Sequence, residues 1–238
     1  MPVMQIGSLA VQLNRKAIKH LHISVLPPDG RVRVSAPEKM TDTAIRMAVI
    51  SRIPWIKKQQ RSFIEQPRQS QREMVSGESH YLWGRRYRLE LTERTGRHEI
   101  THQGNSKLHL WVNPGTSRDN KARVMDSFYR AEMKRHISEL LDYWMPVLGV
   151  EAAAWGVKKM KTKWGSCSIQ SKRIWLNLEL AKKPPECLEY ILVHELVHLL
   201  ERHHSERFRQ YMNRYLPDWQ ERKALLNKGP LSHELWEY

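Results

Sequence analysis

Alternation of apolar and polar residues dominates the first part of the chain and predicts short β-strands. The alternation runs through residues 3–26 and resumes at 31–34, on either side of the turn-forming run Pro-Pro-Asp-Gly at 27–30. Side chains of a strand point alternately to its two faces, so this pattern predicts an antiparallel hairpin with one buried face. Residues 41–65 then follow a helical period, and Pro54 is expected to break or restart that helix.

A linker, further strands and one long helix come next. The run at 66–71, which is rich in Gln and contains a proline, predicts the linker. Residues 77–93 and 98–112 each predict strands around a turn that contains glycine. Over Ser117–Trp144 apolar residues recur at steps of three and four, which predicts a helix with one buried face that ends at Pro146.

A hairpin follows the long helix. Residues 157–168 and 173–180 predict two strands joined by a turn at 169–172. Such a hairpin leaves an open backbone edge, to which an extended peptide can add by main-chain hydrogen bonds. In the second strand we expect one set of side chains to point inward, Ile174, Leu176, Leu178 and Leu180, and the other outward, Trp175, Asn177 and Glu179.

The segment 184–204 predicts a buried helix that carries ionisable residues. Apolar residues occupy nearly every direction around this helix, which predicts burial on all sides. Within the apolar stretch lie His194, Glu195 and His198. Buried polar groups are costly unless they are paired or bind a metal, so these three residues require an explanation.

The spacing of these residues predicts a zinc site. Residues four apart lie one above the other on a helix, so His194 and His198 can reach one metal ion. His-Glu-x-x-His is the signature of zinc proteases, in which the glutamate takes a proton from the water and passes it to the leaving amine. A catalytic zinc keeps one position open and requires one further protein ligand. His204 is the best candidate if the helix ends near Arg202, although spacing alone does not separate it from His203.

Several motifs together resemble one family of metallopeptidases. The run Lys163–Ser168 (Lys-Trp-Gly-Ser-Cys-Ser) precedes the alternating segment Ile174–Leu180, which is followed by the helix that includes Tyr190–His198. His203-His204-Ser205 and Phe208 come after that helix. This order is similar to that of the YgjP-like metallopeptidases and, more distantly, of the SprT and Spartan proteases. Those families pair a Trp-Gly-Ser-Cys strand with His-Glu-x-x-His and a later His.

The resemblance implies an α+β fold with a zincin-like metallopeptidase core, in which the active-site helix lies against a small antiparallel sheet. It also implies that the long helix at 117–144 packs behind the active-site helix. An N-terminal β-hairpin and helix extension precedes this core. We therefore expect two regions: the β-hairpin and helix region at 1–72, and the metallopeptidase domain at 73–238 with its core at about 117–216.

The resemblance also implies the roles of individual residues. Zn²⁺ is the expected cofactor, with His194, His198 and His204 as its ligands and Glu195 as the general base. The strand next to the cleft is expected to hold the substrate through Trp164, Gly165, Ser166, Cys167 and Ser168.

Composition and charge narrow the possible partners and the cellular compartment. Forty Lys and Arg against 25 Asp and Glu give a net charge of +15, which fits an anionic partner such as nucleic acid, but equally a generally basic surface. Two cysteines, Cys167 and Cys187, and no signal peptide predict a reducing, cytoplasmic setting. No stretch of about 18 apolar residues occurs, so no membrane span is expected.

Three functions are consistent with these observations. The first is a zinc metallopeptidase that hydrolyses peptide bonds in a protein or peptide substrate. The second is a SprT-like protease brought by its basic surface to DNA-bound proteins, with binding that weakens steeply as salt is raised. The third is a non-catalytic, zinc-stabilised basic binding protein, which would have no use for Glu195 between two ligands.

Overall fold

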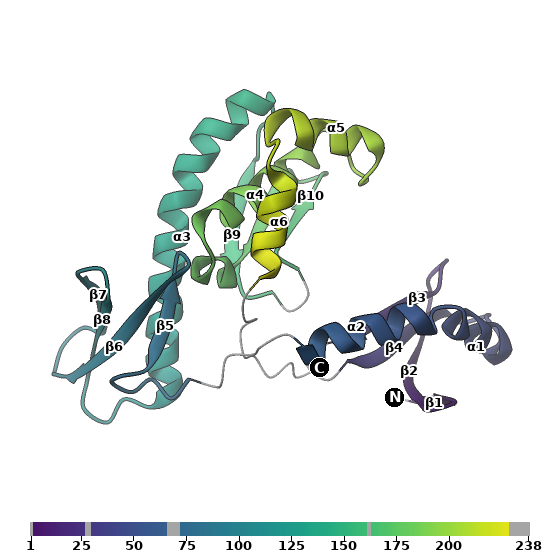
Figure 1. Cartoon of the computed structure of the whole chain (residues 1–238), viewed down its shortest axis with the longest axis horizontal. Helices are drawn as coiled ribbons and strands as arrows, with labels where there is room; N and C mark the ends of the chain where they lie inside the picture. The colour runs from purple at the N-terminus through teal and green to yellow at the C-terminus, as the bar shows by residue number, and fades with distance from the viewer. Residues whose placement is uncertain (1, 27–29, 66–71, 161–162, 229–238) are drawn as a thin grey trace. The chain divides into compact units, whose positions relative to one another are not determined.

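The computed structural model describes residues 2–26, 30–65, 72–160 and 163–228 (Figure 1). Two compact units divide the chain, one formed by residues up to Gln71 and the other by Arg72–Lys228. Each unit contains both helices and sheet, which confirms the predicted α+β class. Among the described helices, none is long and apolar enough to cross a membrane.

The first unit is built on a four-stranded sheet. The predicted hairpin on either side of residues 27–30 is confirmed, although residues 27–29 themselves lie outside the described residues. A further strand pair precedes it, and one of its strands runs parallel to the second strand of the hairpin. The strands are β1 (Val3–Ile6), β2 (Leu9–Lys16), β3 (His22–Leu26) and β4 (Arg31–Pro37), in the order β1-β2-β4-β3.

Two helices cover one face of this sheet. α1 (Asp42–Ile50) begins after Thr41, whose Oγ1 accepts a hydrogen bond from the N–H of Ala44 at 3.3 Å. α2 (Ile53–Glu65) restarts with Pro54 in its first turn, where the missing N–H costs no helical hydrogen bond, as the sequence predicts. The buried residues come from alternate strand positions and one helix face: Met4, Ile6, Val11, Leu13, Val32, Val34, Ala36, Ile45, Val49 and Ile56.

The second unit begins with another four-stranded sheet, as the two predicted strand pairs indicate. Its strands are β5 (Ser79–Leu82), β6 (Arg85–Glu93), β7 (Glu99–Gln103) and β8 (Lys107–Val112), in the order β5-β6-β8-β7. The β5–β6 turn lies against the start of the later helix α4. Gly84 has φ of 76°, and a Cβ there would lie 2.9 Å from Pro184, so glycine permits this contact.

The long helix α3 (Arg118–Leu148) extends along this unit, with the four-stranded sheet near its first half and α4 near its second (Figure 1). Ser117 caps its N-terminus, and its buried stripe packs behind α4, as predicted. The prediction that Pro146 ends the helix is wrong. Pro146 lies within the last turn, where one lost hydrogen bond is tolerated, and the helix ends before Gly149, whose φ of 65° forms the C-cap.

The segment predicted as one strand over 157–168 is two strands. β9 (Ala154–Lys158) and β10 (Gly165–Ser168) lie at opposite edges of a sheet with β11 (Arg173–Asn177) at its centre. β10 and β11 form the predicted antiparallel hairpin, but β9 runs parallel to β11. The expectation of a purely antiparallel sheet is therefore corrected to a mixed one.

Asn177 explains why β11 ends early. We predicted an outward side chain and a strand continuing to residue 180, yet Asn177 is buried and 3₁₀-helix η1 (Leu178–Lys182) begins after it. Its Oδ1 accepts from the N–H of Glu179 at 3.2 Å and caps this helix. Its Nδ2 donates to the carbonyls of Met160 and Lys163 at 2.9 and 2.8 Å, which holds the segment before β10.

Three helices complete the unit: α4 (Pro185–Val197), α5 (Glu206–Tyr215) and α6 (Trp219–Asn227). α4 begins at the predicted proline pair and is buried on nearly all sides. α6 packs against α4, where Arg222 forms an ion pair with Glu189. Nε1 of Trp144 on α3 also donates to Glu189, at 3.0 Å. This carboxylate therefore links α3, α4 and α6.

Candidate metal centre

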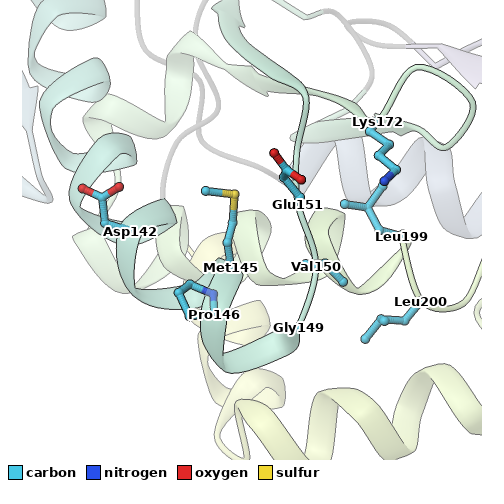
Figure 2. A pocket seen from close by; sticks show the side chains of 9 residues that line it. All are labelled: Asp142, Met145, Pro146, Gly149, Val150, Glu151, Lys172, Leu199 and Leu200. Carbon is cyan, nitrogen blue, oxygen red and sulfur yellow. The ribbon is translucent and has the colours of Figure 1, made fainter.

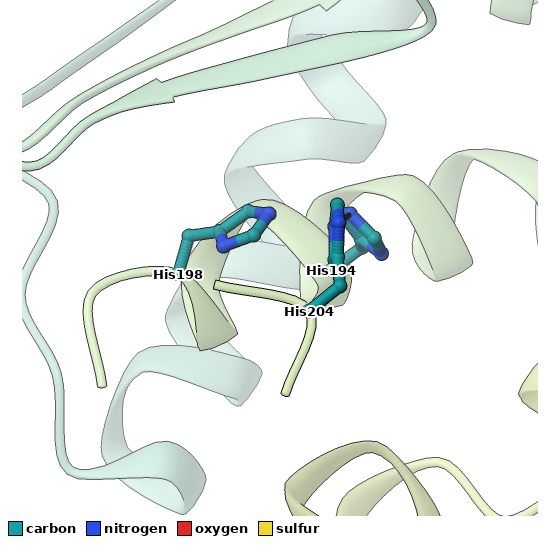
Figure 3. A group of neighbouring side chains, drawn as sticks. All are labelled: His194, His198 and His204. Atoms are coloured by element: carbon teal, nitrogen blue, oxygen red, sulfur yellow. Dashed lines mark hydrogen bonds between the residues drawn. The ribbon is translucent and has the colours of Figure 1, made fainter. Parts of the chain in front are cut away.

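Three histidine side chains meet at the end of α4. His194 lies in its last turn, His198 caps its C-terminus, and His204 lies just before α5. Their ring centroids form a nearly equilateral triangle with sides of 4.9, 4.9 and 4.8 Å (Figure 3). One ring nitrogen of each histidine lies within 4.8 Å of one ring nitrogen of each of the others, and Nε2 of His204 lies 3.0 Å from Nε2 of His194.

A tight turn after α4 brings the chain back to this point. The prediction that the helix ends near Arg202 is wrong, because α4 ends at Val197. The N–H groups of Leu199 and Leu200 bond to carbonyls three residues back, at 2.9 Å each, so the last turn is tighter than an α-helix. This early end leaves enough chain to return His204 to the other two rings.

His203, the alternative that spacing left open, lies outside the cluster. It is exposed, and its backbone N–H donates to Oε1 of Glu201 at 3.1 Å. Across the described part of the chain, the group of side chains close enough to hold a metal ion is His194, His198 and His204. The geometry therefore favours His204 as the third candidate ligand.

Backbone contacts and burial prepare the rings to bind a cation. The carbonyl of Glu201 can only accept, so Nδ1 of His198, 3.1 Å away, carries the proton and leaves Nε2 free. Burial lowers the pKa of His198. Burial, followed by the neighbouring His198 and His204, lowers the pKa of His194 to about 3. These two half-buried rings are thus neutral at neutral pH, the form in which imidazole binds metals.

The cluster fits a tetrahedral zinc ion. Two nitrogens that each lie about 2.0–2.1 Å from such an ion are about 3.3 Å apart. The 3.0 Å between Nε2 of His194 and Nε2 of His204 is close to that value, so a small adjustment of either ring suffices. Three imidazoles also leave the fourth position open, which is the donor set of a catalytic rather than a structural zinc site.

Phe208 forms an apolar wall of the cluster. Its ring centroid lies 4.9, 4.8 and 4.9 Å from those of His194, His198 and His204, and its side chain is buried. Ser205 fixes this position, because its Oγ accepts the N–H of Phe208 at 3.3 Å and starts α5. An apolar wall limits water near the ligands and so strengthens electrostatic interactions there.

Glu195 is buried beside strand β10. Its side chain is 6% exposed, and this burial, opposed by Lys163, raises its pKa to about 7. Gly165 makes room for it: a Cβ at that position would lie 2.6 Å from Oε1 of Glu195 and 2.9 Å from a methyl carbon of Ile191. Only a residue without a side chain permits this approach of strand and helix.

Strand β10, an edge of its sheet, contains four of the five residues predicted to bind substrate, and the fifth, Trp164, directly precedes it. Burial and the nearby carboxylate of Glu195 raise the pKa of the Cys167 thiol to about 11, so this thiol is protonated at neutral pH. The five predicted residues differ in exposure: Gly165 is buried, Trp164, Ser166 and Cys167 are half-buried, and Ser168 is exposed.

A cavity of ≈ 750 Å³ lies beyond the turn that follows His198, but none of the three clustered histidines lines it (Figure 2). The side chains drawn in Figure 2 come from the end of α3, from the β10–β11 turn and from the turn after α4. They are Asp142, Met145, Pro146, Gly149, Val150, Glu151, Lys172, Leu199 and Leu200. The cavity is therefore separate from the ligand cluster.

Sequence reasoning missed two residues that shape this site. Phe208 is named above only among the motifs of the family resemblance, and its contact with all three histidines was not predicted. The sequence did contain an indication of this contact, since Phe208 lies one helical turn after His204 and three residues after the capping Ser205. Asn177 carried no such signal, because an alternating strand pattern places it outside.

A helix that carries His-Glu-x-x-His, a third histidine returned by a turn, and a buried glutamate beside an edge strand define a metallopeptidase type of site. Comparison with known families agrees. Residues 19–229 match the model of the YgjP-like metallopeptidase domain, and the chain belongs to this family. The match extends over both units. Membership implies a divalent metal and a peptide or protein substrate.

Two solved structures are similar to part of the chain, and both are metallopeptidase zymogens. Abylysin of Pyrococcus abyssi shows 22% identity and a TM-score of 0.35, with 40% of this chain and 99% of that chain covered. Jannalysin of Methanocaldococcus jannaschii shows 25% identity and a TM-score of 0.34, with 40% of this chain and 92% of that chain covered. No curated protein matches the chain significantly.

Proposed function

We propose that the chain is a zinc-dependent peptidase that hydrolyses peptide bonds. His194, His198 and His204 are the proposed zinc ligands, and Glu195 is the proposed general base. The observation that supports this most is the meeting of three imidazoles at the end of a helix that also carries a buried carboxylate. A purely structural zinc site has no use for that carboxylate, so the arrangement favours catalysis.

The residues of the chain supply the proton transfers. Zinc bound at the cluster would polarise a water molecule and the substrate carbonyl. Glu195 is suited to take the proton of the attacking water, because a pKa raised to about 7 makes its carboxylate a good acceptor near neutral pH. The same carboxyl group then gives the proton to the leaving amine. Phe208 limits water around the ligands during this transfer.

The edge of β10 is the proposed substrate-binding element. β10 pairs with β11 on one side, and Gly165 brings it against Glu195. An extended peptide that adds to the other side by main-chain hydrogen bonds would place a peptide bond next to the base. Recognition through the backbone also fits the absence of the three clustered histidines from the ≈ 750 Å³ cavity.

A pair of neighbouring variants tests this proposal. His204→Ala should lose bound zinc and cleavage of an unfolded test protein, whereas His203→Ala should keep both, because His203 lies outside the cluster. Zinc is measured by mass spectrometry after gel filtration, and cleavage by gel electrophoresis. Full zinc content in His204→Ala, or equal loss in the two variants, would remove His204 from the ligand set.

A nucleic-acid-directed protease is the second candidate. Residues 1–71 contain 12 Lys and Arg against four Asp and Glu, a net charge of +8 within the +15 of the whole chain. Retention on DNA that falls steeply between low and high salt supports this candidate, and retention independent of salt contradicts it.

Cys167 and Cys187 are not paired with each other. For both candidate functions this favours a reducing compartment such as the cytoplasm.

A further inference from the structure

The first unit contains a cavity of ≈ 440 Å³ between strand β3 and the two helices. Leu21, His22 and Ile23 line one side of it. Leu21 directly precedes β3, and His22 and Ile23 are its first two residues. Successive side chains of a strand point to opposite faces of the sheet, so His22 and Ile23 can border one cavity where it opens along the side of the strand. The cavity therefore runs beside β3 rather than under the sheet.

β3 has an unpaired side at this position. In the strand order β1-β2-β4-β3 it is an edge, and its pairing within the described residues is with β4 alone. An edge strand presents a row of N–H and C=O groups that can accept another strand. An open edge with a cavity beside it is the arrangement with which proteins bind extended peptides, because the backbone supplies affinity and the cavity receives a side chain.

The opposite wall of the cavity is formed by residues where α1 and α2 meet. Ala48 of α1, Ser51 and Arg52 of the turn between the two helices, and Trp55 of α2 line it. Trp55 is 40% exposed, and its ring beside the cavity offers a surface for an apolar residue of a partner.

The charge around the cavity indicates which kind of peptide would bind there. Among the described residues that line the cavity, Arg52 is charged and none carries a carboxylate. Lys19 comes two residues before Leu21, and Lys58 comes three residues after Trp55; both side chains are exposed. Both belong to residues 1–71, which carry a net charge of +8. An acidic peptide is attracted to such a surface and a basic one is repelled.

We propose that the side of β3 and the adjoining cavity bind an extended, acidic polypeptide segment that inserts an apolar side chain beside Trp55. Such a surface would let the protein hold a substrate at a second place, away from the bond that is cut. The inference rests on the proposed peptidase function only in treating the bound segment as substrate. Binding itself is measured without cleavage, so the two proposals fail separately.

The test uses the full chain carrying Glu195→Gln and a fluorescein-labelled peptide of about ten residues in which Glu alternates with Leu or Val. Fluorescence anisotropy should show saturable binding that weakens as salt is raised. A matched peptide with Lys in place of Glu should bind at least about tenfold more weakly. A peptide with alternate backbone nitrogens methylated should lose binding as well, since it cannot form a strand.

Two exposed positions supply the variants. Trp55→Ala and Arg52→Glu, each made in this background, should weaken binding about tenfold. Lys57→Glu changes the same charge on the side of α2 that faces away from the cavity and should change the affinity less than about twofold at moderate salt. Thermal unfolding checks that all three variants fold.

Three results would overturn the proposal. The first is equal binding of the Glu and Lys peptides, and the second is unchanged affinity in both cavity variants. The third is displacement of the peptide by single-stranded oligothymidylate that binds more tightly and depends on Trp55. That last result would assign the surface to nucleic acid instead.

Discussion

Gly165 lies where strand β10 passes against Glu195, the proposed general base. A Cβ there would be 2.6 Å from Oε1 of Glu195, a separation that real side chains do not adopt. Gly165→Ala must therefore displace either the carboxylate or the strand, at a cost of about 1–3 kcal/mol of stability. The three histidines come from other elements, so zinc binding should survive.

The expected result for Gly165→Ala is a large loss of kcat/KM with unchanged zinc content. Gly156→Ala, on strand β9 at the opposite edge of the same sheet, serves as the control and should retain most activity, because a Cβ there would lie 2.5 Å from the ring of Trp175 rather than near Glu195. Steady-state kinetics and zinc analysis measure both. Full activity in Gly165→Ala would show that the approach of β10 to Glu195 does not position the base.

His80 provides a pH-dependent residue remote from the metal ligands. It is 4% exposed, and burial lowers its pKa more than the hydrogen bond of Nε2 to Glu78, at 3.1 Å, raises it. The unfolded chain therefore takes up a proton at His80 at a higher pH than the folded chain does. Stability is lost as the pH falls through the unfolded value of 6.5, because protonation then favours unfolding.

We accordingly expect the melting temperature of the wild type to fall more between pH 7 and 5 than that of His80→Gln, which cannot be protonated. Differential scanning calorimetry at the two pH values measures this. The difference between the two proteins isolates His80 from the other titrating groups. Equal falls in both proteins would show that burial does not control this side chain.

At the scale of elements, the turn between α4 and α5 decides whether the site exists. The His-Glu-x-x-His spacing predicted two of the clustered histidines, because a helix repeats every 3.6 residues. It left His203 and His204 open, since a return turn has no fixed period. The hydrogen bonds of Leu199, Leu200 and Ser205 select the direction in which His204 points.

The sheet next to the site also has features that the local sequence pattern could not predict. The alternation over Arg173–Asn177 predicted β11, and the loop before it predicted the hairpin with β10. The parallel pairing of β9 was not predictable from alternation, which is the same for parallel and antiparallel neighbours. The end of β11 depends on hydrogen bonds from Asn177 to residues 14 and 17 positions away, which no local pattern contains.

Removal of the metal should increase local unfolding around α5 and leave the first unit unchanged. Zinc that binds the folded state contributes about 4 kcal/mol when its free concentration is about 1,000 times Kd. A chelator should therefore increase amide exchange in residues 198–208 and in α5, which His204 and Phe208 tie to the cluster. Strands β3 and β4 of the other unit are the internal control.

Hydrogen–deuterium exchange with mass spectrometry follows both regions in one sample. Faster exchange around α5 with unchanged exchange in β3 and β4 is the expected result. Unchanged exchange around α5 after complete zinc removal would contradict a site formed by the described histidines.

For the whole molecule, charge and chemistry are distributed unevenly between the two units. The candidate ligands, the base and strand β10 all belong to Arg72–Lys228, while residues 1–71 carry more than half of the net charge in less than a third of the chain. Composition alone described an evenly basic protein. The division into units shows that the basic part and the candidate catalytic part are separate.

Cleavage of an unfolded test protein by the zinc-loaded wild type, beside Glu195→Gln, tests the central claim most directly. Glutamine keeps the shape of the side chain but cannot take up a proton, so zinc content should be equal and the rate should fall by roughly 10²- to 10⁴-fold. Equal rates in the two proteins would contradict the role of Glu195. Absence of cleavage by fully zinc-loaded wild type on any unfolded protein would contradict general peptidase activity.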